Sequence, residues 1–339
     1  MNFITGATGM LGAHLIGELL KRAMPVVAGC RSMESTEESL TLLRFMGFSE
    51  EQIQSIQWRI CDVLDTDALI RAFDGCSTVY HTAAIVSYHS TDRAIMYETN
   101  VQGTANVVNA ALSLGGIKII HVSSIASLGK SNPGQTLNEN AEWKNSAFNT
   151  HYGITKHLSD LEIWRGVQEG IEALIVHPGF IIGAGSFERS SPSVFKKIKE
   201  GLAYYPPGGT GFISAKDCAF AMVELAHSKA QNEAFILVTR SESMQWLFQH
   251  VAAALGCPAP NKLASPMLMQ IARIAEWLKE LLFGKKALIT RETVKNASIQ
   301  FYYDNQKLMS AIPNRTWDLE PEILFAAKYF DSRQPSRVL

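Results

Sequence analysis

The chain has 339 residues, 47% of them hydrophobic, and a formal net charge of −1. This length and composition can bury a full core in one large domain or in two interleaved domains. The nearly neutral charge excludes a global field that would draw the protein to nucleic acid or to an anionic membrane.

The five cysteines lie far apart, and their spacing does not match that of metal ligands. We expect them to be reduced and structural, which suits a cytoplasmic protein without a metal site. No signal peptide is expected before the first predicted strand, because a glycine loop already begins at residue 6.

Residues 3–12 predict a strand, a tight turn and the start of a helix. An apolar run ends in a loop with glycines at every third position, and apolar residues then recur at helical spacing. We expect Gly6 to permit the turn, Gly9 to let the backbone approach a pyrophosphate, and Gly12 to let the helix pack close to the strand. The helix start would offer N–H groups and a positive dipole end to phosphate. A glycine-rich turn without a ligand is the alternative.

The second strand, expected at residues 25–28, is followed by Cys30, Arg31 and Ser32, none of which is acidic. In NAD-preferring versions of this unit an acidic residue near this point holds the ribose 2′-hydroxyl. Arg31 can instead pair with a 2′-phosphate and Ser32 can add a hydrogen bond, which favours NADP(H) over NAD(H). The alternative is that Arg31 is a solvated loop residue.

Two further strands, expected at residues 56–61 and 76–81, are each followed by candidate cofactor contacts. Asp62 can accept a hydrogen bond from an adenine amino group, or it can cap the next helix. The segment Thr82-Ala83-Ala84 is small enough to let the flat parts of a cofactor come close. We interpret His81 as a packed core residue rather than a catalyst.

A helix is expected from Asn100 to about Leu114, and a fifth strand at residues 117–122. Asn100 can cap this helix or bond the neighbouring backbone. Residues at the carboxyl ends of parallel strands face the ligand crevice, so Ser123 and Ser124 are catalytic candidates. A polar strand end with no further role is the alternative.

Tyr152 and Lys156 are one helical turn apart and share a face. The ordinary pKa of tyrosine is about 10, and a nearby ammonium would lower it by stabilising the phenolate. The phenol could then give a proton to a carbonyl oxygen, or take one from an alcohol, near neutral pH. This spacing is common by chance, but the upstream glycine loop and a strand-end serine 28 residues before Tyr152 strengthen the interpretation.

In order and spacing, these motifs resemble the extended short-chain dehydrogenase/reductase superfamily, of NAD-dependent epimerase/dehydratase type. The resemblance covers nearly the whole chain and rests on residues 5–12, 62–63, 81–84, 100–104, 122–124 and 152–156. It implies an α/β fold with a Rossmann-type doubly wound parallel sheet that binds NAD(P), and a smaller, mostly helical C-terminal substrate domain.

The resemblance also implies a catalytic set in which Tyr152 is the acid/base, Ser124 holds the substrate oxygen and Lys156 also bonds the nicotinamide ribose. Family precedent places the catalytic serine second in its pair, so Ser124 is preferred to Ser123. Asn100 matches a position that supports a water-linked proton relay in some members. The expected cofactor contacts are Gly6, Thr8, Gly9, Met10, Leu11, Gly12, Arg31, Ser32, Asp62, Val63, Thr82, Ala83, Ala84, Tyr152, Lys156, Pro178 and Ile181.

Within the superfamily the chain looks most like the dihydroflavonol reductase, cinnamoyl-CoA reductase and 3β-hydroxysteroid dehydrogenase branch. Sugar dehydratases place an acidic pair after the catalytic serine or threonine, where this chain has Ile125 and Ala126. Epimerases and dehydratases commonly carry Arg-Pro after the sixth strand, where this chain has His177 before its proline. No clear arginine pattern for a nucleotide diphosphate follows, although Arg189 and residues 196–199 remain candidate phosphate partners.

We expect a Rossmann domain over residues 1–185, joined again by 212–240, and a substrate domain over residues 186–211 and 241–330. Aromatic residues in the predicted loops indicate an apolar or flat substrate, or equally the packing of one domain on the other. The expected substrate contacts are Tyr88, Ser124, Phe180, Phe187 and Tyr204.

The longest apolar region, residues 266–283, contains four charged residues and is too short and interrupted for the roughly 20 apolar residues that span a bilayer. We expect a buried or dimer-interface helix here. A lid over an apolar substrate and a helix lying on a membrane surface are the alternatives. A homodimer is expected from the family only.

The favoured function is a cytoplasmic reductase or alcohol dehydrogenase that uses NADP(H), with NAD(H) as the alternative cofactor, on a carbonyl or secondary-alcohol substrate. A nucleotide-sugar epimerase with tightly bound NAD is one alternative. A non-enzymatic NADP(H)-binding regulator is another, and the intact pair of Tyr152 and Lys156 argues against it.

Overall fold

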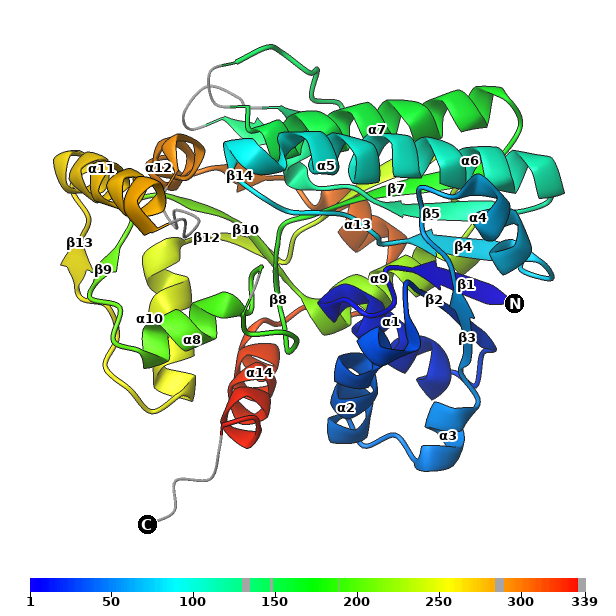
Figure 1. The fold of residues 1–339 in the computed structure, drawn as a ribbon, viewed down its shortest axis with the longest axis horizontal. Coiled ribbons are helices and arrows are strands. Elements are labelled where there is room, and N and C mark those ends of the chain that lie inside the picture. Colours follow the sequence, from blue (N-terminus) through cyan, green and yellow to red (C-terminus); the bar gives the residue numbers. More distant parts are fainter. Residues whose placement is uncertain (130–134, 147–148, 189, 284–289, 335–339) are drawn as a thin grey trace.

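The structure, a computed structural model, describes residues 1–129, 135–146, 149–188, 190–283 and 290–334. Seven parallel strands form the central sheet in the order β11-β7-β5-β4-β1-β2-β3. Helices cover both faces of this sheet (Figure 1), which confirms the predicted doubly wound α/β fold. The strands are β1 (Asn2–Thr5), β2 (Val26–Cys30), β3 (Gln57–Ile60), β4 (Thr78–His81), β5 (Lys118–Val122), β7 (Glu172–Pro178) and β11 (Glu233–Leu237).

Successive side chains of each strand point to opposite faces of the sheet and so build two cores. Ile4 and Tyr80 belong to one core, whereas the adjacent Phe3 and Val79 belong to the other. The first core is covered by α1 (Met10–Lys21), α2 (Glu37–Phe45), α3 (Glu50–Gln54) and α9 (Ala215–His227). The opposite face carries α4 (Thr66–Phe73), α5 (Arg93–Tyr97), α6 (Gly103–Leu114) and α7 (His151–Gln168).

A second group of elements, the C-terminal assembly, lies at the carboxyl edge of the central sheet (Figure 1). Its three-stranded sheet has the order β12-β10-β8, and Phe195, Leu247 and Ile323 pack in its core. The chain returns to the central sheet through α9 and β11. The predicted division of the chain into a Rossmann domain and a substrate domain stays a prediction. The assembly comprises β8 (Phe180–Ile182), α8 (Ser193–Lys199), β9 (Tyr204–Tyr205), β10 (Gly209–Ser214), β12 (Arg240–Ser243), α10 (Met244–Ala254), β13 (Lys262–Leu263), α11 (Pro266–Phe283), α12 (Arg291–Ala297), β14 (Tyr302–Tyr303), which pairs with β6 (Thr136–Leu137), and α14 (Glu320–Ser332). The helix α13 (Gln306–Ala311) instead packs in the first core of the central sheet, together with β11.

The helix expected to open at Asn100 begins earlier. The chain runs from α5 through one turn of π-helix, Glu98–Gln102, into α6. The amide of Asn100 accepts the N–H of Ile85 at 2.8 Å and donates to the carbonyl oxygen of Ile85 at 2.9 Å. Asn100 therefore does not cap the helix. Its side chain bonds the backbone of the segment after β4, which confirms the alternative prediction for this residue.

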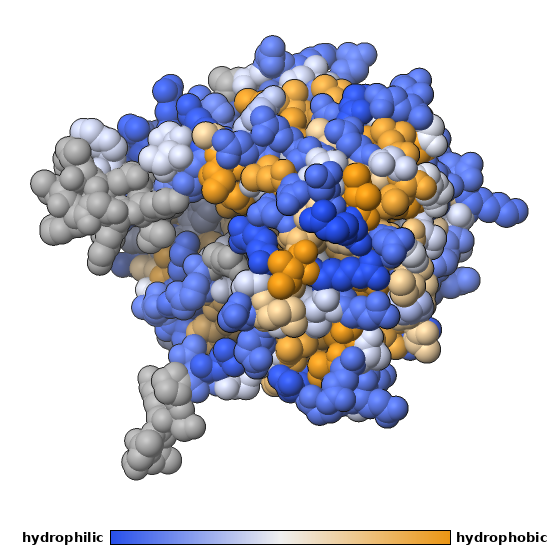
Figure 2. All heavy atoms as spheres, turned by 45° about the vertical axis from the view of Figure 1, so that its right-hand side comes forward, coloured by the Kyte–Doolittle hydropathy of each residue, from blue (hydrophilic) through white to orange (hydrophobic). Residues whose placement is uncertain are grey.

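The apolar region at residues 266–283 forms α11, but its described side chains are largely exposed. The exposed fractions are 74%, 53%, 48% and 57% for Met267, Ile271, Ile274 and Trp277. The expected burial within the chain is wrong for these residues, because Met269, on the other side of the helix, is the one that packs against Val294 of α12. The dimer interface, the lid and the membrane-surface helix stay predictions. In the described part of the chain, no helix is long and apolar enough to cross a membrane. Figure 2 shows hydrophilic side chains over much of one face, with apolar patches between them.

The glycine loop brings separate stretches of backbone into contact. Gly6 has a φ of +66°, and a Cβ there would lie 2.7 Å from the backbone nitrogen of Ala83. A Cβ on Gly12 would lie 2.4 Å from the carbonyl oxygen of Gly6 and 2.7 Å from the Cα of Ala7. The turn expected at Gly6 is confirmed, whereas Gly12 packs against the loop itself and not against the strand.

Replacing Gly12 with alanine should lower the free energy of unfolding by about 1–3 kcal/mol, because the methyl group would overlap backbone atoms that cannot rotate away. Urea denaturation measures this change. Gly9→Ala is the matched control, since a Cβ at Gly9 meets one neighbour at 3.3 Å, and its loss of stability should be smaller. Equal losses for both variants would contradict the packing role of Gly12.

Candidate active site

The chain changes direction across the sheet between β1 and β4, and doubly wound folds bind ligands at such a point. β1 leads outward to β2 and β3, whereas β4 lies on the other side of β1. The hydroxyl of Thr5 accepts the N–H groups of Thr82 and Ala83 at 3.1 and 3.2 Å. The structure thus places the glycine loop beside the 82–84 segment, and both contain predicted cofactor contacts.

The glycine loop fits the pyrophosphate of a dinucleotide. α1 begins at Met10 with Gly9 as its N-cap, and the N-cap position offers no side chain to the first turn. The backbone contacts at Gly6 and Gly12 leave no room for side chains, so the loop is a cradle of backbone atoms. The N-terminus of a helix can bind a phosphate through its free backbone N–H groups and its positive dipole end.

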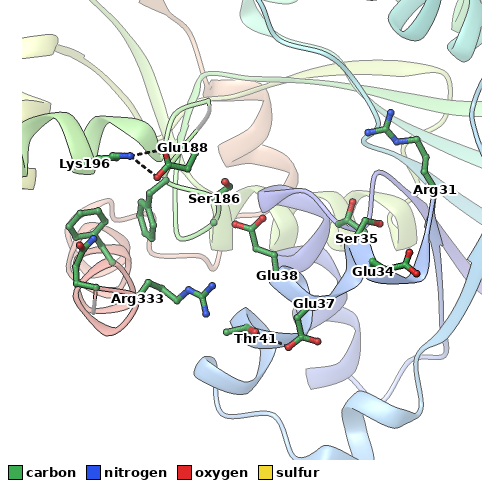
Figure 3. Close-up of a pocket in the computed structure, with 15 residues that line it drawn as sticks. Arg31, Glu34, Ser35, Glu37, Glu38, Thr41, Ser186, Glu188, Lys196 and Arg333 are labelled. Atoms are coloured by element: carbon green, nitrogen blue, oxygen red, sulfur yellow. Dashed lines mark hydrogen bonds and ion pairs between the residues drawn. The ribbon is translucent and has the colours of Figure 1, made fainter. Parts of the chain in front are cut away.

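A pocket of about 850 Å³ adjoins this loop, between α2 and α14 (Figure 3). Thr8, Arg31 and Lys196 are among its lining residues, and Arg31 is exposed on it. Ser32, which was predicted to bind phosphate, interacts with Glu34 in this structure. The pKa of the Glu34 carboxyl lies below its usual value, mainly because of the backbone N–H of Glu34 and secondly because of the Ser32 hydroxyl. The pocket therefore contains both the predicted phosphate-binding arginine and acidic groups.

Tyr152 and Lys156 lie on α7, which packs against the segment that follows β5. The hydroxyl of Thr150 caps α7 by accepting the N–H of Gly153 at 2.9 Å. A Cβ on Gly153 would lie 2.7 Å from the carbonyl oxygen of Ala126, so glycine allows the helix to come this close. The approach brings the phenol of Tyr152 within hydrogen-bonding reach of the Ser124 hydroxyl.

Burial controls the protonation of Tyr152. It raises the pKa of Tyr152 above the ordinary value, and Tyr88 raises this pKa further. The Ser124 hydroxyl lowers it only in part. The predicted net lowering of the pKa of Tyr152 is therefore not seen, because burial outweighs the other effects. The phenol is protonated at neutral pH.

Lys156 is 1% exposed and lies beneath the site. Burial lowers the pKa of its ammonium group to about 8, while Asp160 acts in the opposite direction. The Nζ atom lies 3.5 Å from Nε2 of His121. Lys156 therefore carries its proton near pH 7, inside the protein.

The two serines after β5 turn to different sides. Ser123 is 3% exposed, and its hydroxyl donates to Oδ2 of Asp160 at 2.8 Å. Ser124 is half-buried, accepts the N–H of Ala126 at 3.1 Å, and faces Tyr152. Ser124, unlike Ser123, is therefore available to a ligand at Tyr152.

The amide of Asn100 also reaches the catalytic helix. It donates to the hydroxyl of Thr155 at 3.0 Å, and that hydroxyl donates to the carbonyl oxygen of Tyr152 at 2.9 Å. Asn100 is fully buried. The structure therefore connects Asn100 to the backbone of Tyr152 through one side chain.

The predicted substrate residues do not all gather at Tyr152. The ring of Tyr88 lies 6.5 Å from that of Tyr152, edge to face. Phe180 packs on Phe212 at 5.7 Å, and Tyr204 is 41% exposed on β9. Phe187 packs in an aromatic cluster of the C-terminal assembly and lines the pocket of Figure 3.

The remaining predicted cofactor contacts lie at strand ends. Asp62 accepts the N–H of Leu64 at 2.9 Å, and Asp65 caps the next helix, so the capping alternative for Asp62 is wrong. Val63 packs against Gly103. Pro178 is the last residue of β7, and Ile181 lies in β8, the next strand.

Three site residues were not predicted from the sequence: His121, His177 and Asp160. They lie buried beside Lys156 and Ser123. A signal exists, because β4, β5 and β7 each carry a histidine in their last two positions, and Asp160 follows Lys156 by one helical turn.

The family model named NAD dependent epimerase/dehydratase family matches residues 2–237. The chain is 27% identical over 290 residues to sterol demethylase protein B of Methylococcus capsulatus, with 84% of this chain and 83% of that protein covered. It is 25% identical over 331 residues to 3beta-hydroxysteroid-dehydrogenase/decarboxylase isoform 1 of Arabidopsis thaliana, with 90% and 73% covered.

Solved structures support the same fold. UDP-glucose 4-epimerase of Thermotoga maritima matches with a TM-score of 0.74 and 16% identity, over 98% of this chain and 99% of that one. An identity this low shows the fold alone. Together with the family match, these findings establish that the chain belongs to the NAD dependent epimerase/dehydratase family, within the extended short-chain dehydrogenase/reductase superfamily.

Proposed function

We propose that the protein is a reductase or alcohol dehydrogenase that uses NADP(H) to interconvert a carbonyl group and a secondary alcohol. The observation that carries this proposal is the placement of the half-buried Tyr152 beside Ser124 and one helical turn from Lys156, with the pKa of its phenol raised by burial. The glycine loop that fits a dinucleotide lies at the same edge of the sheet. A bound nicotinamide would supply the hydride, or accept it in the reverse direction.

Each side chain has a distinct role in the proposed reduction. Tyr152 donates its proton to the carbonyl oxygen, and its raised pKa keeps that proton in place until the oxygen becomes basic. Ser124 holds the same oxygen through its hydroxyl. The charge on Lys156 stabilises the phenolate that Tyr152 becomes. Asn100 positions the first turns of α7 through Thr155.

The charges of the C-terminal assembly favour this proposal over a nucleotide-sugar epimerase. A sugar diphosphate calls for free basic side chains, but two candidates at residues 196–199 are engaged: Lys196 is paired with Glu188 at 2.6 Å, and Lys199 lies 4.0 Å from Asp331. Lys197 is exposed and stays a candidate phosphate partner. Arg189, another candidate, lies outside the described residues. The intact catalytic set argues in the same way against a regulator that only binds the cofactor.

We further propose that the substrate is an apolar ring compound. Tyr88 provides an aromatic wall beside Tyr152, and it contacts that residue edge to face. Of the relatives reported above, one has a name that refers to a sterol and the other a name that refers to a 3beta-hydroxysteroid. Cyclic ketones and the corresponding alcohols are therefore the first compounds to screen.

Tyr152→Phe should lower turnover by about 10²–10⁴-fold, the usual contribution of a general acid, and should leave the affinity for NADPH unchanged. The measurement is the rate of NADPH oxidation with a cyclic ketone that the wild type reduces. Tyr97→Phe is the matched control, since Tyr97 is 46% exposed on α5. A Tyr152→Phe variant that turned over at the wild-type rate would refute the mechanism.

Arg31→Ala should raise the Kd for NADPH by about 10–100-fold, because a charged hydrogen bond contributes about 1.5–3 kcal/mol. The Kd for NADH should change little, and both follow from titrations of nicotinamide fluorescence. Arg71→Ala is the control, because Arg71 is exposed near the end of α4, at the opposite edge of the sheet. Equal losses for both cofactors would refute the role of Arg31, and NAD that does not exchange from the wild type would favour the epimerase.

A further inference from the structure

A buried polar cluster lies beneath Tyr152, and the proposed mechanism does not use it. Its members Asp160, His121 and His177 are 6%, 0% and 4% exposed. They come from α7, β5 and β7, so three separate elements deliver titratable groups to one place. A cluster of this kind in the interior is costly unless its members compensate one another.

Asp160 is the anchor of this cluster. Its Oδ2 accepts the hydroxyl of Ser123 at 2.8 Å and lies 3.9 Å from Nδ1 of His177. That nitrogen lies 3.0 Å from the hydroxyl of Ser127, which in turn lies 3.0 Å from the hydroxyl of Ser123. The carboxylate is therefore fixed by groups from three neighbouring segments.

His121 lies between Asp160 and Lys156. Its Nε2 atom lies 3.5 Å from Nζ of Lys156 and 3.5 Å from Oδ1 of Asp160. The carboxylate and the ammonium thus approach the same imidazole nitrogen from two directions. Lys156 and Asp160 are also one turn apart on α7, so both belong to the same face of that helix.

The cluster holds one carboxylate and one ammonium group among neutral imidazoles. Burial lowers the pKa of His121 to about 4 and also lowers the pKa of His177. Burial raises the pKa of Asp160, but its interactions with His121, His177 and Lys156 outweigh this effect and leave that pKa below its usual value. The titratable groups that face Asp160 are Tyr152, Lys156, His157, His121 and His177, while His81 faces His121 and Glu139 faces His177.

We propose that Asp160 is a positioning residue: held by Ser123 and one helical turn from Lys156, its carboxylate keeps Lys156 charged and in place beneath Tyr152. The inference rests on the proposed function, because there Lys156 acts on the phenol of Tyr152. Asp160 does not touch the reacting atoms. It acts through the charge and the position of Lys156.

A purely structural role for Asp160 makes a different prediction. If Asp160 only satisfied the hydroxyl of Ser123, its loss would reduce stability and leave the protonation of Lys156 unchanged. If Asp160 is the counter-charge, its removal must make the buried ammonium harder to protonate. A nearby opposite charge shifts a pKa by about 1–3 units.

The test is a pH titration of Lys156 by NMR in the whole chain labelled with ¹³C at the lysine Cε. The signal of Lys156 is identified as the one that Lys156→Arg removes. In the wild type it should titrate near pH 8. In Asp160→Asn the midpoint should fall by about 1 unit or more, since the opposing charge is gone.

The controls separate charge from folding. Glu162→Gln removes a carboxylate from the same helix, where Glu162 pairs with Arg165 at 2.8 Å, and it should leave the midpoint unchanged. Asp160→Glu keeps the charge and should restore a midpoint close to the wild-type value. If Asp160→Asn does not fold, Ser123→Ala removes the anchor of the carboxylate and should shift the midpoint in the same direction by a smaller amount.

The outcomes distinguish this inference from the proposed function. An unchanged midpoint in both Asp160→Asn and Ser123→Ala would overturn the inference, even if the wild type reduces ketones. A shifted midpoint in a wild type that reduces no carbonyl compound would support the inference and refute the proposed function. Where both hold, the loss of ketone reduction at high pH should move to lower pH in Asp160→Asn by the same amount as the midpoint.

Discussion

Burial of the Lys156 side chain is the constraint on which the carboxyl edge of the sheet depends. An ammonium group removed from water is destabilising by several kcal/mol unless polar partners compensate it. The partners come from elements far apart in the sequence, with His121 on β5 and Asp160 on α7, the latter held by Ser123. The catalytic helix must therefore lie close to the strand ends, and Gly153 permits this approach because it has no Cβ to meet the backbone after β5.

A second close approach of backbones defines the other end of the crevice. Gly6 lies against Ala83 where β1 and β4 end, and Gly12 lies against the loop that Gly6 begins. The place that fits a pyrophosphate and the place that holds the phenol of Tyr152 are thus fixed by the same device, a glycine that lets two main chains touch. Because both contacts involve the carboxyl ends of the same parallel sheet, the distance between the two places is set by the sheet and not by flexible loops.

The sequence predicted what local spacing can encode. The glycine loop and the pair of Tyr152 and Lys156 each lie within one turn or one loop, so their arrangement follows from helix and turn geometry. The cluster around Asp160 could not be predicted in this way, because it forms only when β5 and β7 become neighbours in the sheet. Periodicity likewise predicted the helix at residues 266–283, but it gave no information on what covers the apolar face, and the chain's own core does not bury that face. The raised pKa of Tyr152 is a third example, since burial depends on the whole fold.

The carboxylate of Glu292 connects the C-terminal assembly to the catalytic helix. It accepts the backbone N–H of His151 at 3.2 Å and lies 3.6 Å from the imidazole of that residue. The first N–H groups of a helix have no partner within the helix, and the helix dipole favours a negative charge beside them. His151 directly precedes Tyr152, so α12 contributes to the position of the proposed acid. Burial is the main cause that raises the pKa of Tyr88, the aromatic neighbour of Tyr152, and the carboxylate of Glu292 is the second cause. The packing of α12 is therefore part of the geometry of proton transfer, because a shift of Glu292 would change both the end of α7 and the electrostatic surroundings of the two phenols.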